Sequence, residues 1–120
     1  MKIGTSETQK IKDKIHAEMR RIALKRHPYC VVCGRRDGIL QGGHLIPRKR
    51  SEAVRFDLMN VFTQCSGCNS YHTRNMHPFI EWFIKEYGEA EYFELLKRSR
   101  NIVKRNKTQL REVLEEYKKL

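Results

Sequence analysis

The sequence contains no run of about 18 apolar residues, the length that a bilayer-spanning helix requires. Its first residues, MKIGTSETQKIKDK, also lack the apolar centre of a signal peptide. These two absences exclude an integral membrane protein and a conventional secreted protein. We therefore expect the chain to lie in the cytoplasm, where cysteines stay reduced.

Acidic residues are scarce relative to basic ones: 14 Asp and Glu accompany 25 Lys and Arg, giving a net charge of +11. This imbalance indicates a polyanionic partner, and nucleic acid fits better than a membrane surface because no lipid-facing helix is expected. A soluble basic protein without such a partner is the alternative. The chain has 120 residues, of which 39% are hydrophobic, so we expect one domain, 1–120. Its hydrophobic core would be small, and an internal cross-link would help to stabilise it.

The first part of the chain changes from a helical pattern to a glycine-rich one. A helical segment is predicted for 1–28, with Ser6 as its cap and Pro28 at its end. Its buried face comprises Ile11, Ile15, Met19, Ile22 and Ala23. Between 29 and 63, the short apolar pieces YCVVCG, ILQGGHLI and NVFTQC favour strands and loops.

The remainder of the chain is predicted to be helical. One helix covers 77–87, where Pro78 occupies the first turn and Gly88 ends the pattern. A more polar helix is expected over 89–107, and Thr108 is expected to cap a last one. The predicted buried residues of the first and last of these helices are Phe79, Ile80, Phe83, Ile84, Tyr87, Leu110, Val113, Leu114, Tyr117 and Leu120.

All cysteines fall in two C-x-x-C pairs, separated by 31 residues. Zinc binds four thiolates at tetrahedral corners, and each C-x-x-C turn offers two of them. A redox C-x-x-C would open a helix within a βαβ unit, which the sequence does not predict. We expect a structural zinc site, with a redox role as the alternative. Its ligands would be Cys30, Cys33, Cys65 and Cys68.

Histidine and asparagine residues lie between and after these pairs. His44 ends a strand-like run, Asn60 precedes another, and Asn69 and His72 follow the second pair about one helical turn apart. Phosphodiester hydrolysis needs a base, which neutral imidazole supplies, and a hard cation. We interpret His44 as the base, Asn60 as its orienting residue, and Asn69 with His72 as anchors for Mg²⁺ or Mn²⁺. Backbone hydrogen bonds and helix capping are the structural alternatives.

Basic residues follow His44 closely. Contacts with DNA phosphates are expected from Arg48, Lys49, Arg50, Arg55 and Arg74. The segment 97–107 is either a second phosphate track or a solvated linker. Nothing resembles a helix that reads base edges, so affinity should be mainly electrostatic and salt-sensitive. His16 and His27 are expected to face solvent.

The order CVVCG, GGH, RFDLMN, QCSGCN and YG closely resembles the bacteriophage NinG/Rap recombination-nuclease family, a branch of the HNH (ββα-metal, treble-clef zinc) endonucleases. The resemblance covers Cys30 to about Gly88. It implies that His44 is the general base, Asn60 the motif asparagine and Asn69 the third, metal-binding position. The sequence departs from the wider HNH pattern at two positions: residue 43 is Gly instead of Asp or His, and residue 69 is Asn instead of His.

The expected fold is α+β: a zinc-stapled ββα-metal (HNH/treble-clef) core at 29–76, with a helix at 1–28 and helices at 77–120. The resemblance implies a metal-dependent DNA endonuclease, phage-encoded and acting in the host cytoplasm on branched duplexes such as Holliday junctions or D-loops. A plain HNH nicking or restriction-type nuclease and a non-catalytic zinc-containing DNA-binding module remain as alternatives. Symmetric junction resolution would favour a homodimer, because two opposed strands need two active sites.

Overall fold

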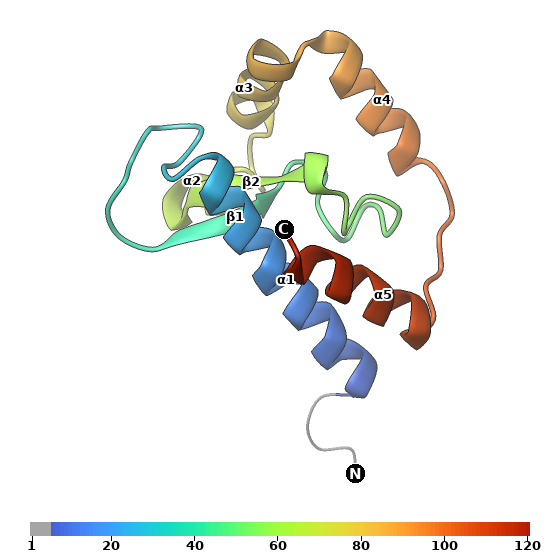
Figure 1. The fold of residues 1–120 in the computed structure, drawn as a ribbon. Coiled ribbons are helices and arrows are strands. Elements are labelled where there is room, and N and C mark those ends of the chain that lie inside the picture. Colours follow the sequence, from blue (N-terminus) through green and yellow to red (C-terminus); the bar gives the residue numbers. More distant parts are fainter. Residues whose placement is uncertain (1–5) are drawn as a thin grey trace.

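An antiparallel two-stranded hairpin lies at the centre of the fold, with helices on both of its faces (Figure 1). Its strands are β1 (Leu40–His44) and β2 (Val61–Cys65). The register pairs Leu40 with Cys65 and His44 with Val61. Together with the helices described below, this sheet confirms the predicted α+β class.

The computed structural model describes residues 6–120. Residues 1–5 lie outside the described part. They belong to the predicted helical segment 1–28 and to the N-terminal stretch that is predicted not to be a signal peptide. Among residues 6–120, no helix combines the length and apolar character needed to cross a membrane.

Helix α1 (Glu7–Arg26) packs against one face of the hairpin. The Oγ atom of Ser6 accepts a 3.1 Å hydrogen bond from the backbone N–H of Gln9, which confirms the predicted cap. The helix ends at Arg26, two residues before Pro28. Its predicted apolar face is buried at every position, namely Ile11, Ile15, Met19, Ile22 and Ala23.

Helix α5 (Lys107–Lys118) packs alongside α1 (Figure 1). The predicted cap, Thr108, is wrong: Asn106 is the cap, and Thr108 lies inside the first turn. Asn106 Oδ1 accepts from the N–H of Gln109 at 2.8 Å, while Gln109 Oε1 accepts from the N–H of Asn106 at 2.9 Å. This reciprocal pair satisfies two backbone donors that Thr108 would leave free. The predicted apolar face is buried at Leu110 and Leu114, whereas the prediction for Leu120 is wrong because its side chain is exposed.

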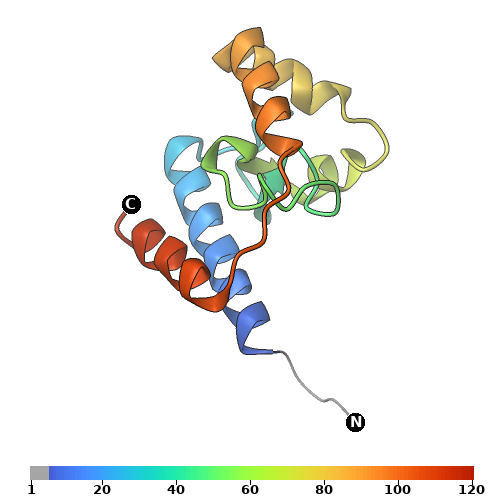
Figure 2. The same ribbon diagram turned by 90° about the vertical axis from the view of Figure 1, so that its right-hand side faces the viewer.

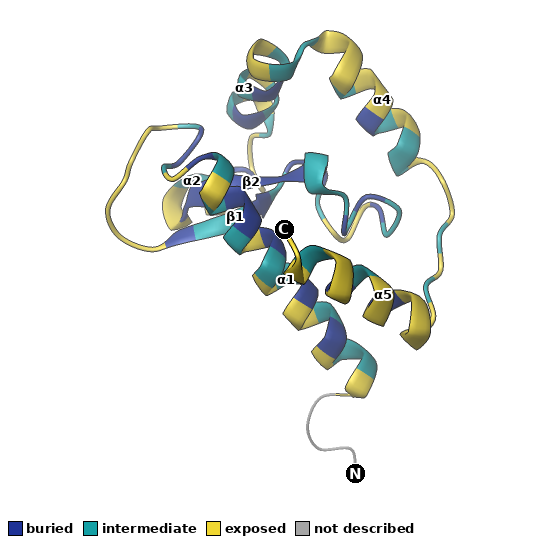
Figure 3. Ribbon diagram, viewed as in Figure 1, coloured by how far each residue is buried: buried dark blue, intermediate teal, exposed yellow. Residues whose placement is uncertain are grey.

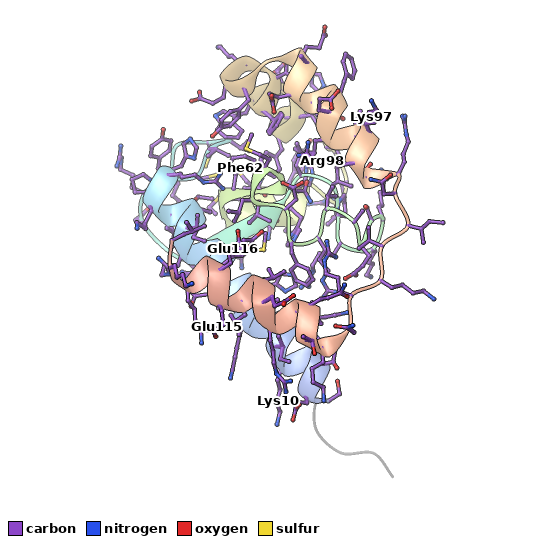
Figure 4. All side chains as sticks on the ribbon, turned by 45° about the vertical axis from the view of Figure 1, so that its right-hand side comes forward. Lys10, Phe62, Lys97, Arg98, Glu115 and Glu116 are labelled. Atoms are coloured by element: carbon purple, nitrogen blue, oxygen red, sulfur yellow. The ribbon has the colours of Figure 1, made fainter. Side chains whose placement is uncertain are left out.

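The other side of the hairpin faces α2 (Ser66–Tyr71), α3 (His77–Tyr87) and α4 (Glu89–Ser99). Phe62 of β2 anchors the α3–α4 pair and lies between the pair and the hairpin (Figure 4). The centroid of its ring lies 5.1 Å from that of Trp82 and 5.7 Å from that of Phe83. Because both faces of the hairpin are covered, β2 is buried along its whole length (Figure 3).

The helix predicted over 89–107 is wrong in its second half. It ends at Ser99, and the following residues run as a strap down to α5 (Figure 2). The guanidinium of Arg105 donates to the backbone carbonyls of Glu52 and Ala53 at 3.0 and 3.2 Å. These distant contacts favour an extended strap, as do the β-branched residues Ile102 and Val103, which are poor helix formers.

The segment YCVVCG, one of three pieces predicted to form strands and loops, forms a turn, as expected for a C-x-x-C pair that binds a metal. The N–H of Cys30 donates to the carbonyl of Arg35, and the N–H of Gly34 donates to the carbonyl of Cys30, each at 2.8 Å. The N–H of Val31 ties the turn to the Thr63 carbonyl of β2 at 2.9 Å. Local pairing of this kind curls the chain so that Cys30 and Cys33 approach the end of β2.

Two adjacent glycines of β1 allow close packing on opposite faces of the hairpin. A Cβ atom on Gly42 would lie 3.3 Å from the Cα atom of Arg20, so glycine allows α1 to approach. A Cβ atom on Gly43 would lie 2.0 Å from Oε1 of Gln64, whose side chain fills that space. Close packing on both faces of the hairpin therefore explains why two glycines directly precede His44.

The loop between the strands is held by Asn60, which ends a short 3₁₀ turn (Leu58–Asn60) and is fully buried. Its Oδ1 atom accepts from the N–H of Ile46 at 2.8 Å. Its Nδ2 atom donates to the carbonyls of Ile46 and Val54 at 2.9 and 3.1 Å. Arg98, at the end of α4 (Figure 4), adds a 2.8 Å ion pair with Asp57. Asn60 and Arg98 thus hold this loop from two sides.

Candidate functional site

Four cysteine sulfurs from two distant segments gather into one cluster. The Sγ atoms of Cys30, Cys33, Cys65 and Cys68 all lie within 4.8 Å of one another, and those of Cys33 and Cys65 are 3.8 Å apart. A tetrahedral zinc ion with Zn–S bonds of about 2.3 Å separates its sulfurs by about 3.8 Å. The cluster could therefore hold a zinc ion where the 30–33 turn meets β2 and α2.

The chemistry of these thiols also favours a cation. The N–H of Cys68, 3.4 Å from Sγ of Cys65, lowers the pKa of the Cys65 thiol to about 7, whereas burial raises the pKa of Cys68. Four thiolates would repel one another in so small a volume unless a cation lay among them. Convergence of both C-x-x-C pairs on one point fits zinc binding better than the redox alternative.

A basin of about 880 Å³ opens beside β1, α1 and α2. Three of the predicted catalytic and cation-binding residues line it: His44, Asn69 and His72. They come from the end of β1 and from α2 and its C-terminal cap, so the hairpin and the following helix bring them together. Asn60 does not line the basin and lies beneath the loop at its edge.

The backbone sets the tautomer of His44. Its Nε2 atom lies 2.9 Å from the carbonyl oxygen of Arg55. A carbonyl only accepts hydrogen bonds, so Nε2 carries the hydrogen and Nδ1 keeps its lone pair. The pKa of His44 is lowered to about 4, mainly because the ring is buried. The hydrogen bond to the Arg55 carbonyl raises the pKa, and the positive charges of Arg48 and Arg55 lower it further. The ring is neutral at pH 7 and can accept a proton at Nδ1.

His16 of α1, which the sequence predicts to face solvent, lies in the wall of the basin. Its ring is edge-on to that of His44, with centroids 5.4 Å apart. Its Nδ1 atom is 3.1 Å from Nη1 of Arg48, and its Nε2 atom is 3.3 Å from Nε of Arg55. Burial, together with His44 and these two arginines, lowers the pKa of His16 to about 3. His16 is therefore a neutral ring between two guanidinium groups.

The hydrogen bonds of Asn60 and His72 reach the backbone just after His44. Asn60 holds both polar backbone atoms of Ile46 through its side chain, and its carbonyl accepts from the N–H of Leu45 at 2.8 Å. The Nε2 atom of His72 donates to the Leu45 carbonyl at 2.8 Å. The Nδ1 atom of His72 is buried without a partner among residues 6–120. Asn60 thus acts on His44 through the backbone, and His72 would have to uncover Nδ1 to bind a cation.

Asn69 is the predicted cation ligand with the most accessible donor atom. Its Nδ2 atom donates to Oε1 of Gln41 at 2.8 Å, so Oδ1 is its free end. Within residues 6–120, neither Asp nor Glu lines the basin. Mg²⁺ is usually held by one or two carboxylates together with substrate phosphates. The amide oxygens and imidazole nitrogens present here suit a weakly held cation that phosphate oxygens would help to retain.

The predicted phosphate-binding residues differ in their availability. Three are exposed and line the basin: Arg48, Lys49 and Arg50. The side chain of Arg55 is only 15% exposed and pairs with Glu52 at 3.3 Å. Arg74 does not line the basin, and its guanidinium lies 5.7 Å from the ring centroid of Tyr71. The free positive charge therefore lies on the loop that follows β1.

Comparison with known proteins identifies one family. The model of a family described as bacteriophage Lambda NinG protein matches residues 3–120. No curated protein and no solved structure matches the chain significantly. The match extends over both flanking helices as well as the hairpin and the cysteine cluster.

Proposed function

The chain belongs to the bacteriophage lambda NinG family, and from this premise we propose that it is a metal-dependent DNA endonuclease of the HNH type. Its substrates would be branched recombination intermediates such as Holliday junctions or D-loops. The chain would act in the cytoplasm of the phage's bacterial host. The resemblance in the motifs around His44 and the cysteine pairs supports the HNH assignment.

The observation that carries this proposal is the neutral, oriented ring of His44. The Arg55 carbonyl occupies Nε2, so Nδ1 is the atom that would take a proton from water. The resulting hydroxide would attack the phosphorus atom, and the P–O bond to the leaving sugar oxygen would break. Arg48, Lys49 and Arg50 would bind the phosphates on either side of the cut.

A divalent cation, Mg²⁺ or Mn²⁺, would supply neutralisation of charge on the phosphate and on the leaving oxygen. Asn69 would hold it through Oδ1, and His72 remains a second candidate ligand. Because these donors are uncharged, we expect the cation to bind weakly to the free protein and more tightly once DNA phosphates are present. Zinc at the four cysteines would have a structural role only.

We expect the shape of the DNA, and not its base sequence, to determine which substrates are cut. Phosphate contacts carry no base information, and the basin is lined by basic side chains on an exposed loop. The strap adds a second row of positive charge at Lys104 and neighbouring residues, which would suit a second arm of a branched duplex. A homodimer would place one site on each of two opposed strands.

A non-catalytic zinc-containing DNA-binding module is the second candidate. Among residues 6–120, no acidic residue lines the basin, and position 43, where many HNH sites carry Asp or His as a metal ligand, is Gly; both features favour this candidate. A plain HNH nicking enzyme would share the basin but not the preference for junctions.

Cleavage of a substrate panel separates these candidates. A linear duplex, a nicked duplex, a D-loop and a four-way junction would be incubated with Mg²⁺, with Mn²⁺ and without metal, at several salt concentrations. We expect metal-dependent cutting of the branched substrates, with binding that weakens steeply as salt rises. Equal cutting of linear and branched DNA would indicate the plain nuclease, and binding without cutting would indicate the non-catalytic module.

A further inference from the structure

One side of α4 packs on α3, whereas its other side is exposed (Figure 3). On the packed side, Leu95 is fully buried, and the ring centroid of Tyr92 lies 6.2 Å from that of Phe83 on α3. On the outer side, Phe93 is 56% exposed, although phenylalanine is among the residues most often found fully buried. The outer side of α4 thus carries an aromatic ring that the described part of the chain does not cover.

Oppositely charged residues flank Phe93 at equal distances along the helix. Glu89 lies four residues before Phe93 and Lys97 lies four residues after it, and all three are exposed. Residues four positions apart share one face of an α-helix. Neither Glu89 nor Lys97 forms an ion pair among residues 6–120. These three residues, the α4 stripe, therefore have an acidic end, an aromatic centre and a basic end.

The α4 stripe is complementary to itself. When two copies of α4 lie antiparallel across a twofold axis near Phe93, each Glu89 meets Lys97 of the second copy, and the two Phe93 rings meet at the centre. A twofold interface requires this reciprocity, because the same surface is used by both subunits. A parallel arrangement would instead bring like charges together. The pattern of charge therefore favours a second copy of the chain, in the antiparallel orientation.

The surroundings of the α4 stripe also suit self-association. The whole chain has a net charge of +11, so two copies would repel each other through most of their surfaces. Segment 81–94 is different, because its five acidic residues accompany one basic residue, Lys85. All of these acidic residues are exposed, namely Glu81, Glu86, Glu89, Glu91 and Glu94. Two copies can therefore approach through α3 and α4 with less repulsion than through the basic loop.

We propose that the α4 stripe is the contact surface of a symmetric homodimer. DNA fits this surface less well, because the acidic residues around Phe93 would repel phosphates. The end of α4 is joined to the basic loop: the carbonyl of Ser99 accepts a 2.7 Å hydrogen bond from Oγ of Ser51, next to Arg50 of the basin. A dimer formed through α4 would therefore link the two basins. This inference rests on the proposed function for the use of the dimer, but not for its formation.

Sedimentation equilibrium of the full zinc-loaded chain, without DNA, tests the α4 stripe. A contact of one 11-residue helix per copy lies at the small end of specific interfaces, so we expect a Kd of about 10–100 µM for the wild type. Phe93→Ala should weaken dimerisation at least about tenfold, because a central aromatic residue usually carries much of the binding energy. Ile39→Ala, which truncates a side chain that is 71% exposed before β1, should leave the Kd unchanged.

Charge exchange tests the antiparallel orientation. Glu89→Lys and Lys97→Glu should each weaken dimerisation about tenfold, because like charges would then meet at both ends of the interface. The double variant that combines both changes should return to the wild-type Kd, because opposite charges meet again. Glu91→Lys is the matched control: it makes the same change of charge on α4, but two positions from Glu89 and so off the α4 stripe. Its Kd should stay close to that of the wild type.

Circular dichroism would establish that each variant is folded, as expected for changes at exposed positions. A wild type that stays monomeric up to about 1 mM, an unchanged Kd in Phe93→Ala, or no recovery in the double variant would each overturn the proposal. Weaker DNA binding by Phe93→Ala with unchanged dimerisation would overturn it as well and assign Phe93 to DNA. Because sedimentation involves neither DNA nor turnover, the dimer and the nuclease proposal can each fail without the other.

Discussion

The Nε2 atom of His44 lies 2.9 Å from the carbonyl oxygen of Arg55, across the loop that joins the two strands of the hairpin. The loop positions this carbonyl, so the conformation of the loop determines which nitrogen of the His44 ring remains free. Asn60 pins the loop at Ile46 and Val54, and Arg105 of the strap pins it at Glu52 and Ala53. Residues from the C-terminal part of the chain thus support the candidate base.

Burial of neutral His44 should make stability depend on pH. Its pKa is about 4 in the folded chain and 6.5 for an ordinary histidine. Between these values the unfolded chain binds more protons, so the free energy of unfolding falls as the pH drops from 6.5 toward 4. At about pH 5 the loss from this residue should be at most about 2 kcal/mol.

Urea unfolding at neutral pH and at about pH 5 measures this loss. The control is His44→Gln, which keeps a donor for the Arg55 carbonyl and does not titrate. We expect the wild type to lose more stability than His44→Gln over this interval. Equal losses would contradict the assignment of a buried neutral ring.

His16→Ala should reduce cleavage without abolishing DNA binding. His16 is the neutral ring in contact with both Arg48 and Arg55, so its removal would loosen the groups that surround His44. We expect the single-turnover rate to fall about tenfold, or about 1.4 kcal/mol, with DNA affinity nearly unchanged. His77→Ala is the matched control, because the side chain of His77 is 75% exposed on α3. A loss of affinity equal to the loss of rate would show that His16 serves binding alone.

Gly43→Ala should destabilise the fold by about 1–3 kcal/mol, the usual cost of overpacking. The new Cβ atom would meet Oε1 of Gln64 at 2.0 Å and Cδ at 2.9 Å. The same substitution in a Gln64→Ala background should cost much less, since the colliding atoms are gone. Thermal unfolding of the four proteins gives the coupling. Gly67→Ala, where the nearest atom is 4.0 Å away, should show no such penalty.

Removal of zinc should unfold the chain. The four sulfurs belong to a turn and to the junction of β2 with α2, and a zinc ion among them would cross-link these two segments beyond the backbone bond between Val31 and Thr63. The binding free energy of structural zinc, about 10–16 kcal/mol in zinc-finger peptides, is as large as the stability of a typical domain.

Elemental analysis should therefore find one zinc ion per chain, and strong chelation should abolish the helical circular dichroism signal. Milder chelation that removes only weakly bound cations should leave the fold intact. Cys33→Ser should reduce zinc content even though Cys33 is exposed. An unchanged melting temperature after complete loss of zinc would contradict the structural role.

Local patterns predict most of the helices and the cysteine cluster. The buried face of α1 follows from a spacing of three and four residues, and the cysteine cluster follows from the geometry that zinc requires. The cap of α5 was open to prediction too: Asn106 and Gln109 have the spacing of a capping box, a stronger signal than Thr108 alone. His16 had a weaker signal, as it follows the buried Ile15 and precedes Met19 on the edge of the same face.

Apart from the convergence of the cysteines, the contacts between distant segments could not be predicted. The partner of His44 is a backbone carbonyl, which no residue type reveals. The place of Gln64 beside Gly43 and Asn69 depends on the strand register and on the approach of α2. The end of α4 at Ser99 likewise depends on Arg105 reaching the loop near Glu52. Each of these features arises from tertiary packing, which overrides local propensity.

Single-turnover cleavage of a four-way junction with Mg²⁺ near neutral pH, comparing wild type with His44→Ala, tests the central claim most directly. Loss of the base should slow cleavage by about 10²- to 10⁴-fold while junction binding and zinc content stay the same. Cleavage by His44→Ala at the wild-type rate, or no cleavage by the wild type on any branched substrate, would contradict the account.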